Sequence, residues 1–341
     1  MRWLSGLASK RRFQASLLAG LMAPLALGMM TLGPVALGLV SPAWAGDLAF
    51  VTNQSSSDLS VLDLSEGREI KRLSIPGAPA GVAVDSANGQ VYVVGADSKT
   101  VSAVDMASDA ITANLTLDGG PIGAAIDPAR GRLFVSDWYN ARVWVISTQG
   151  LKLERTLATA APPTGLALSV DGRFLATADR DANTLSLFDA ESLTFLRDIP
   201  VGGHPFGIRF SADGRLFSAD VTDNTISVVN PETGQALGKV PTRERPYGVA
   251  FAQGKGFVTN QYDDSVTIFD MASLEVLKTI DVGEYPEGID TASDGTLVYV
   301  TNWFSNTVSV IDAVNLDVIG EIETGDGPRA FGEFIAEAPK E

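Results

Sequence analysis

Residues 286–323 read PEGIDTASDGTLVYVTNWFSNTVSVIDAVNLDVIGEIE, and this stretch contains one unit of a repeat. It begins with Pro-x-Gly and a short apolar run, and a Ser-Asp-Gly turn follows at 293–295. Further runs at 299–302 and 307–312 are rich in Val, Ile and Thr, and a fourth run, such as 276–280 in the preceding unit, ends near a glycine. Period-two runs of such residues, bounded by Gly, Asp and Asn, are typical of β-strands. Each unit therefore predicts four strands.

The Pro-x-Gly tripeptide occurs once in every unit. Copies start at residues 79, 121, 163, 205, 246 and 286, and the seventh, Pro328-Arg329-Ala330, ends in alanine. The steps between successive prolines are 42, 42, 42, 41, 40 and 42 residues. Four strands per unit, seven times over, predict an all-β fold, a seven-bladed β-propeller with four-stranded antiparallel blades.

The two ends of the repeat array predict how the ring closes. After residue 46 the chain begins with a second strand, at 50–53, and its last strand-like run, at 331–334, is a first strand. We expect 331–334 to be the innermost strand of blade one, so that the C-terminal strand completes this blade. Such closure leaves no unpaired edge between the first and last blades. The propeller is accordingly assigned to 46–336, and 337–341 to a polar C-terminal tail.

Residues 1–45 have the features of an export signal. Four positive charges lie within residues 1–12, residues 14–46 contain no charged side chain, and Ala43-Trp44-Ala45 is a small-x-small cleavage site. This order predicts a signal peptide at 1–45 that is cleaved after Ala45. An uncleaved membrane anchor is the alternative, because the uncharged stretch is long enough to span a bilayer.

Cleavage predicts a protein that is periplasmic or secreted and has no membrane span. The segment Ser9-Lys10-Arg11-Arg12-Phe13 resembles a twin-arginine signal, so Sec and Tat export both stay open.

Composition limits the chemistry available to the chain. The 341 residues include no cysteine and one histidine, His204, which excludes thiolate sites and multi-histidine metal sites. Without residues 1–45, 21 of the 25 basic residues remain against 41 acidic ones, a net charge of −20 that argues against duplex nucleic acid as a partner. No nucleophile–base pattern is recognisable, so we assign no catalytic residue, no metal ligand and no cofactor, and we expect a monomer.

The repeat resembles that of the YVTN-repeat β-propellers, a family that includes the YncE-like exported proteins. The matching residues are YVTN at 299–302 and FVTN at 50–53 and 257–260, together with the Pro-x-Gly starts. The resemblance covers about residues 46–334. It implies a propeller and an exported protein, in a family that mixes binding proteins, scaffolds and relatives of redox and lactonase propellers.

Chain direction indicates which loops share one face of the ring. If first strands start at the top face, the loops before Pro-x-Gly and the loops between strands two and three both return to it. Blades two to four present small or apolar residues there, whereas blades five, six, seven and one present polar and aromatic ones. A concave mouth with such residues predicts a ligand- or partner-binding site. Its candidate residues are His204, Phe206, Arg245, Tyr247, Tyr285, Glu287, Arg329, Trp138, Tyr139, Tyr262, Trp303 and Phe304.

Other interpretations of these residues stay open. The aromatic side chains could instead plug a narrow channel. Arg209 and Asp290 occupy a layer of small residues, where a charge lines the channel or finds a buried partner. Aspartates that end third strands, such as Asp63, should accept backbone N–H bonds from the next turn, and Asn260 should act similarly after a second strand.

Binding or scaffolding without chemistry is the leading hypothesis, and its partner would be an unknown small molecule or a periplasmic or outer-membrane protein. One alternative is a lactonase-like hydrolase with a metal at the channel mouth, to which Glu287 and Asp290 could contribute. A further alternative is single-stranded DNA binding, in which aromatic residues stack on bases and Arg243, Arg245 and Arg329 meet phosphates.

Overall fold

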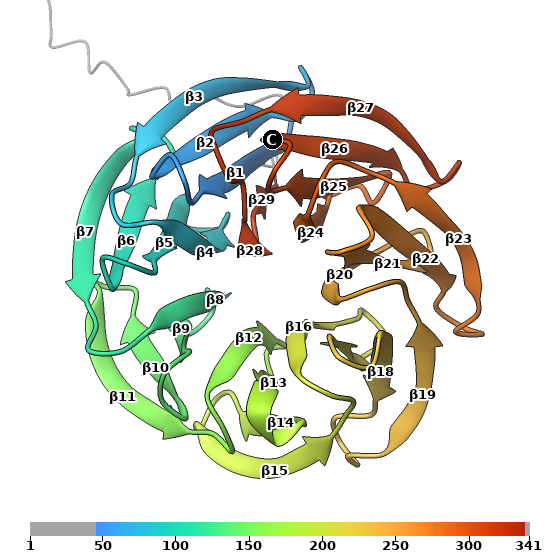
Figure 1. Cartoon of the computed structure of the whole chain (residues 1–341). Coiled ribbons are helices and arrows are strands. Elements are labelled where there is room, and N and C mark those ends of the chain that lie inside the picture. The colour runs from blue at the N-terminus through green and yellow to red at the C-terminus, as the bar shows by residue number, and fades with distance from the viewer. Residues whose placement is uncertain (1–45, 338–341) are drawn as a thin grey trace, which may run out of the picture. The chain divides into compact units, whose positions relative to one another are not determined.

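The computed structural model describes residues 46–337, so the predicted signal peptide and residues 338–341 of the predicted tail lie outside the described residues. Seven sheets, each with four antiparallel strands, stand in a ring (Figure 1), and one of them carries a fifth, parallel strand. This arrangement confirms the predicted seven-bladed β-propeller. The only helical element among the described residues is a short 3₁₀ turn, Arg180–Ala182, in blade four.

The innermost strands of blades two to seven begin at the prolines of Pro-x-Gly. They are β4 (Pro79–Asp85), β8 (Pro121–Asp127), β12 (Pro163–Leu168), β16 (Pro205–Phe210), β20 (Pro246–Ala252) and β24 (Pro286–Thr291). Proline is tolerated at the first residue of a strand, where no ladder bond needs its missing N–H. The pairing register shifts within each Pro-x-Gly, as between Pro246 and Val249, so each copy forms a bulge at the channel wall.

The second and third strands of each blade form its buried interior. The second strands are β1 (Leu48–Asn53), β5 (Gln90–Gly95), β9 (Arg132–Asp137), β13 (Phe174–Asp179), β17 (Leu216–Asp220), β21 (Lys255–Asn260) and β25 (Leu297–Asn302). The third strands are β2 (Asp58–Asp63), β6 (Thr100–Asp105), β10 (Arg142–Ser147), β14 (Thr184–Asp189), β18 (Thr225–Val229), β22 (Ser265–Asp270) and β26 (Thr307–Asp312). Both sets are buried over most of their length because each blade packs between two others.

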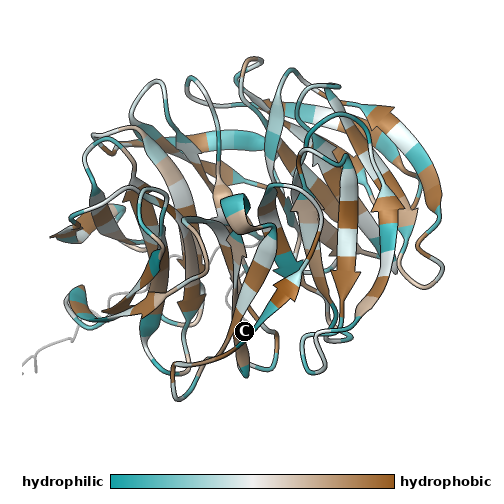
Figure 2. Cartoon of the chain, turned by 60° about the horizontal axis from the view of Figure 1, so that its bottom comes forward, coloured by the Kyte–Doolittle hydropathy of each residue, from teal (hydrophilic) through white to brown (hydrophobic). Residues whose placement is uncertain are grey.

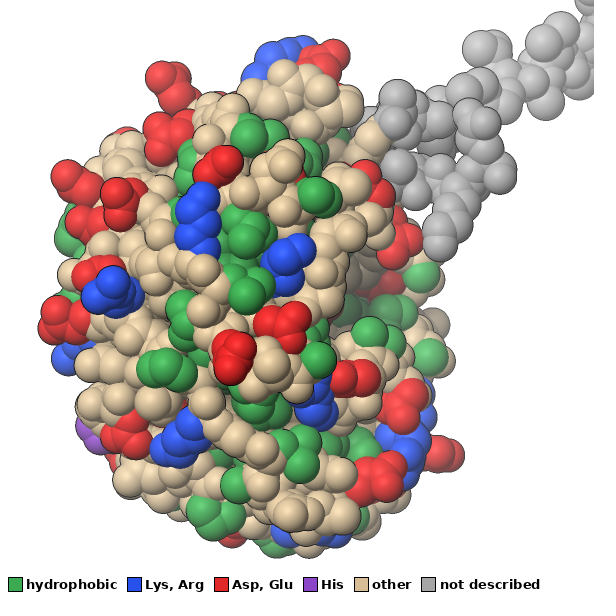
Figure 3. Space-filling view, turned by 90° about the vertical axis from the view of Figure 1, so that its right-hand side faces the viewer, with side chains coloured by type: hydrophobic (Ala, Val, Ile, Leu, Met, Phe, Trp, Pro, Cys, Tyr) green, Lys and Arg blue, Asp and Glu red, His purple; other side chains and the backbone are tan. Residues whose placement is uncertain are grey.

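The fourth strands form the outer circumference of the ring. They are β3 (Arg68–Ser74), β7 (Ala110–Thr116), β11 (Lys152–Ala158), β15 (Thr194–Pro200), β19 (Ala236–Pro241), β23 (Val276–Asp281) and β27 (Asp317–Glu323). Most of their residues are exposed. Apolar and hydrophilic segments alternate along the strands in Figure 2. Figure 3, which faces the side of β19 and β23, shows acidic, basic and hydrophobic side chains interspersed.

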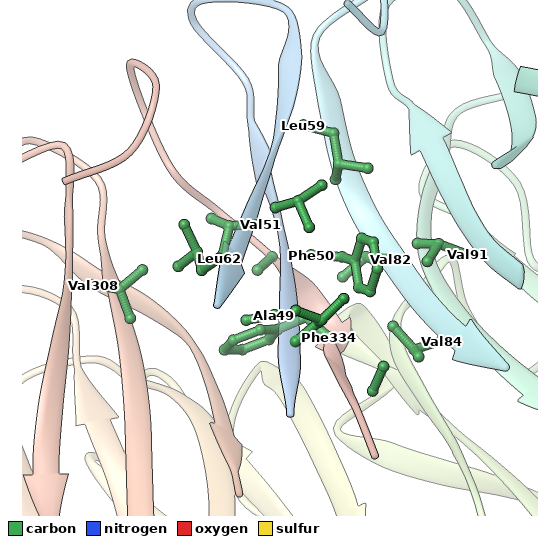
Figure 4. Packing of buried hydrophobic residues seen from close by; sticks show 14 of the residues in the cluster. Ala49, Phe50, Val51, Leu59, Leu62, Val82, Val84, Val91, Val308 and Phe334 are labelled. Atoms are coloured by element: carbon green, nitrogen blue, oxygen red, sulfur yellow. The ribbon is translucent and has the colours of Figure 1, made fainter. Parts of the chain in front are cut away.

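The hydrophobic core lies between neighbouring blades. Around blade one, Phe50 and Leu62 pack together with Val82 of blade two and Val308 of blade seven, and Phe334 from the C-terminal segment joins them (Figure 4). Phe50, Leu62 and Phe334 are fully buried. Burying such a side chain contributes roughly 1.5–3 kcal/mol, so blade-to-blade packing is a main source of stability.

The C-terminal strand completes blade one, which confirms the predicted closure. β29 (Ile335–Ala336) pairs antiparallel with β1, and the Phe50 N–H donates to the Phe334 carbonyl at 2.8 Å. β28 (Phe331–Glu333) instead adds in parallel to β4 of blade two. The expectation that all of 331–334 pairs within blade one is therefore wrong for 331–333.

Two features divert the closing strand. At Gly332 the backbone has φ +141° and lies so close to β4 that a Cβ would come 2.0 Å from the Val82 carbonyl oxygen, so only glycine fits. The carboxylate of Asp290 then accepts the N–H groups of Phe334 and Ile335 at 2.8 and 3.1 Å. The last strand thus crosses from one blade to the next.

The repeated polar residues serve the blades. Asp63 accepts the N–H groups of Ser65 and Glu66 at 2.9 Å each, as predicted for residues that end third strands. Asn260 differs, because its amide group donates to the hydroxyl groups of Ser265 and Thr267 at 3.0 Å each, although its oxygen also accepts a backbone N–H. Asn260 therefore links the second strand of its blade to the third.

Candidate functional site

Strand register confirms which loops share the top face. Pro246, at the start of β20, lies opposite Asn260, and Asn260 lies opposite Ser265 at the start of β22. Ser265 in turn lies opposite Asp281, the last residue of β23. The loop after β21 and the loop before β24 therefore lie at the same end of the ring.

Below this face, aromatic side chains close the axial channel. The ring centroid of Phe206 lies 4.2 Å from that of Tyr247 and 5.1 Å from that of Phe331. Trp138 packs edge-on against Phe206 at 5.8 Å, and Ile122 belongs to the same buried cluster. We call these five residues the plug. The side chain of Tyr247 is only 4% exposed, so this candidate residue belongs to the packed interior, as the channel-plug alternative expects.

A buried ion pair adjoins the plug. The Arg329 Nε lies 2.8 Å from Oε2 of Glu287, which is 1% exposed. Arg329 also donates to the Tyr247 hydroxyl at 2.8 Å and to the side-chain oxygen of Gln54 at 3.2 Å. The amide of Gln261 donates to Oε1 of Glu287 at 2.7 Å. The network joins blades one, six and seven, and the two buried charges compensate each other.

Burial controls the titration of this network. It raises the pKa of Glu287 to about 7, although the neighbouring charge of Arg329 and the bond from Gln261 act to lower it. Burial also raises the pKa of the Tyr247 hydroxyl far above its usual value. Tyr247 is therefore a neutral acceptor for Arg329.

A second aromatic group lies at the solvent edge of blades six and seven. The ring centroid of Tyr285 is 5.5 Å from that of Tyr262, 4.9 Å from that of Phe304 and 6.1 Å from that of Trp303. The Arg245 guanidinium lies 4.5 Å from the Tyr262 ring. We call these five residues the rim. Tyr262 and Phe304 are 48% and 62% exposed.

The backbone holds the rim residues in an unusual conformation. Arg245 and Tyr285 directly precede prolines and have φ values of +57° and +59°. For side chains other than glycine this region costs roughly 1–2 kcal/mol. A side-chain oxygen of the neighbouring blade accepts each N–H: Asn224 binds Arg245 at 3.0 Å, and Asp264 binds Tyr285 at 2.8 Å. Ala78 and His204, at the same position of blades two and five, have φ values of +54° and +51°, so this conformation belongs to the repeat.

A groove of about 360 Å³ runs between blades six and seven beside the rim. Tyr262, Tyr285 and Phe304 line it. Three carboxylate residues, Glu244, Asp264 and Glu284, and the amide of Gln261 complete its lining. We call it the six–seven groove. Burial, and then the Tyr262 hydroxyl, raise the pKa of Tyr285 to about 12, so its phenol is neutral.

Two predicted site residues lie apart from both groups. His204 is exposed, and its N–H donates to Asn183 of blade four at 2.9 Å. Tyr139 is 68% exposed and lies against Gly120 of blade three. The structure therefore divides the twelve predicted residues between the plug, the ion pair, the rim and these two positions.

Arg209 and Asp290 meet each other beside the channel. The Arg209 guanidinium lies 2.6 Å from Asp290 and 3.2 Å from Glu333, and the three residues come from blade five, blade seven and the closing strand. Arg209 also lines an axial cavity of about 80 Å³, room for about five waters. Both expected outcomes, channel lining and a buried partner, apply to Arg209.

The carboxylates considered as metal ligands are engaged elsewhere. Glu287 binds Arg329 and Gln261, and Asp290 binds Arg209 and two backbone N–H groups. Within residues 46–337, no group of three His, Asp or Glu side chains is placed to hold a metal ion. The same part of the chain contains no helix that is long and apolar enough to cross a membrane.

Sequence reasoning missed several residues of this face. Gln54 and Gln261 directly follow second strands, where blades three and seven have tryptophan, and this polar exception was the available signal. Phe331 gave no signal, because its place in the plug depends on the parallel pairing of β28.

Comparison with solved structures agrees with the fold. Hydrazine synthase of Kuenenia stuttgartiensis matches with a TM-score of 0.70 and 19% identity, over 84% of this chain and 100% of that chain. A functionally unknown protein from Desulfotomaculum acetoxidans matches with a TM-score of 0.72 and 15% identity, over 82% and 98%. Dihydro-heme d1 dehydrogenase NirN matches with a TM-score of 0.67 and 15% identity, over 89% and 78%. At these identities the similarity shows the propeller fold.

No family model and no curated protein matches the chain.

Proposed function

We propose that this protein is an exported binding or scaffold propeller whose partner docks on the top face, over the rim of blades six and seven. The observation that carries the proposal is the concentration of aromatic rings there. Tyr262 and Phe304 are 48% and 62% exposed, and both line a groove of about 360 Å³, which is within the size range of ligand sites. The resemblance to YVTN-repeat propellers, and the basic start, uncharged stretch and small-x-small site of residues 1–45, support the exported part of the proposal.

The repeat itself explains why this concentration points to function. Seven copies of one unit need no aromatic residue before the proline to fold, since blades two to four present Ala78, Gly120 and Pro162 where blade seven has Tyr285. Exposing aromatic surface to water costs free energy, and clusters of such residues are enriched where partners bind. Of the described blades, six and seven carry this cluster.

The other two hypotheses gain less support. Single-stranded DNA would place phosphates beside Glu244, Asp264 and Glu284, which repel them. A hydrolase would need metal ligands, and the carboxylates at the channel mouth are already paired.

Site-specific crosslinking tests the proposal. Photoreactive p-benzoylphenylalanine at position 304 should give discrete partner adducts in the producing cells. The matched control is position 314 in the same blade, because Phe304 and Val314 are 62% and 61% exposed but lie at opposite ends of the strands. Adducts of equal yield at both positions, or at neither, would contradict top-face docking.

The intact mass of the exported form should correspond to a chain that begins at Gly46.

A further inference from the structure

The six–seven groove contains carboxylates that no cation of this chain neutralises. Glu244 and Glu284 are exposed, and within residues 46–337 their side chains form neither a hydrogen bond nor an ion pair. Each lies two residues before the proline that starts the first strand of its blade. Their backbone carbonyls accept the N–H groups of Tyr262 and Phe304 at 3.3 and 3.2 Å, which fixes each acid next to an aromatic residue.

The aromatic faces of the rim differ in whether a cation covers them. The Arg245 guanidinium lies over Tyr262 at 4.5 Å, and that of Arg329 lies over Trp303 at 4.8 Å. Among the described residues no Lys or Arg covers Tyr285 or Phe304, the two other rings of the rim. Aromatic faces attract cations, and a nearby carboxylate strengthens the attraction. The groove thus offers two rings that no guanidinium of the described residues covers, together with three carboxylates, and its lining contains no basic residue.

We propose that the six–seven groove receives a lysine or arginine side chain of a protein partner. This inference rests on the proposed function and names the chemistry of the docking residue. A protein suits the surface better than a small amine, because the aromatic rings of Tyr262 and Phe304, which line the groove, are 48% and 62% exposed and present more apolar surface than one amine covers. A polypeptide that inserts one basic side chain would also cover these rings. The inserted side chain would be the buried anchor, and the surrounding apolar contacts would exclude water from it.

The test compares a fluorescent peptide that carries three arginines, spaced by glycine and serine, with a twin that has citrulline at the same positions. Citrulline keeps the planar shape but not the charge. Fluorescence anisotropy with the purified protein should show about tenfold tighter binding of the arginine peptide. The E244Q/E284Q variant should lose about fivefold in affinity for that peptide.

Two control variants separate the groove from general charge and from misfolding. E191Q/E275Q also removes two negative charges, but from the loops after the third strands, at the opposite face. This variant should bind the arginine peptide as the unmodified protein does. Tyr285→Leu should weaken arginine-peptide binding, and its urea unfolding curve will show whether the fold persists.

The outcomes distinguish this inference from the proposed function. Equal binding of arginine and citrulline peptides, with crosslinking at position 304 retained, would overturn the cation preference and leave top-face docking in place. An equal loss in E191Q/E275Q would overturn the groove as the site. Binding of spermidine as tight as that of the peptide would overturn the protein partner. Arginine preference without crosslinking at position 304 would overturn the docking role instead.

Discussion

The rim and the plug come from neighbouring positions of the same repeat, yet they meet opposite environments. Tyr285 precedes Pro286 and reaches the solvent edge, whereas Tyr247 follows Pro246 and is 4% exposed. The left-handed conformation of Tyr285 and Arg245 before their prolines turns these side chains outward, and the bulge after Pro246 turns Tyr247 into the channel. A shift of two residues therefore separates a buried position from one at the solvent edge for the same amino acid.

The largest effect expected is on the plug. Tyr247→Ala should lower the free energy of unfolding by about 3–5 kcal/mol, because it opens a cavity beside Phe206 and removes one of the acceptors of Arg329. Tyr247→Phe keeps the ring and should cost about 1 kcal/mol. Urea unfolding measures both. A change below about 0.5 kcal/mol for Tyr247→Ala would place this residue with the rim.

The contrast between buried and exposed positions applies to charged residues as well, and the ion pair of Arg209 tests it. Arg209→Ala should cost about 3 kcal/mol, because it leaves the carboxylate of Asp290 without its cation next to the closing strand. Arg173→Ala is the matched control, since Arg173 is 58% exposed and bridges exposed Glu232, and should cost less than about 1 kcal/mol. Equal losses in urea unfolding would mean that burial does not govern these pairs.

A dependence on pH is expected from Glu287. Its pKa is about 7 in the folded protein and lies near the ordinary 4.5 in the unfolded chain, so between these values the folded state holds more protons. Stability should then fall as pH rises from 4.5 to 7, by up to about 1.4 kcal/mol per pH unit for this group. Asp179, whose pKa burial raises to about 6, acts in the same direction at lower pH.

The Glu287→Gln variant separates these contributions. It should flatten the decline in unfolding free energy between pH 6 and 7, while the part due to Asp179 stays. An unchanged slope in this variant would assign the dependence to other groups.

The smallest effect is expected at the rim. Phe304→Ala and Tyr262→Ala should each change the free energy of unfolding by less than about 0.5 kcal/mol, because these side chains are exposed and lie outside the buried clusters. Both should reduce crosslinking from a neighbouring rim position. A loss of unfolding free energy comparable to that of Tyr247→Ala would show that the rim is part of the packed structure.

Particular residues show how far the sequence predicted this site. The steps between prolines and the chain direction placed His204, Arg245 and Tyr285 on one face correctly, because antiparallel strands of equal length return to the same end. Nothing in the sequence separated Phe206 and Tyr247 from Tyr262, since burial depends on which way the bulge at Pro-x-Gly turns. Nor could the pairing of Arg209 with Asp290 be predicted, because it joins residues 81 positions apart.

The sequence by itself determined the number of blades, the strands in each blade and the completion of blade one by the C-terminal strand, since period-two patterns and repeat spacing are local properties of the chain. The tertiary structure alone decided the path of that strand, which Gly332 and Asp290 carry from blade two to blade one. It alone also gathered one layer of predicted residues into a buried network and left the other around an acidic, aromatic groove. Those contacts depend on how the blades pack, because they join side chains from different blades.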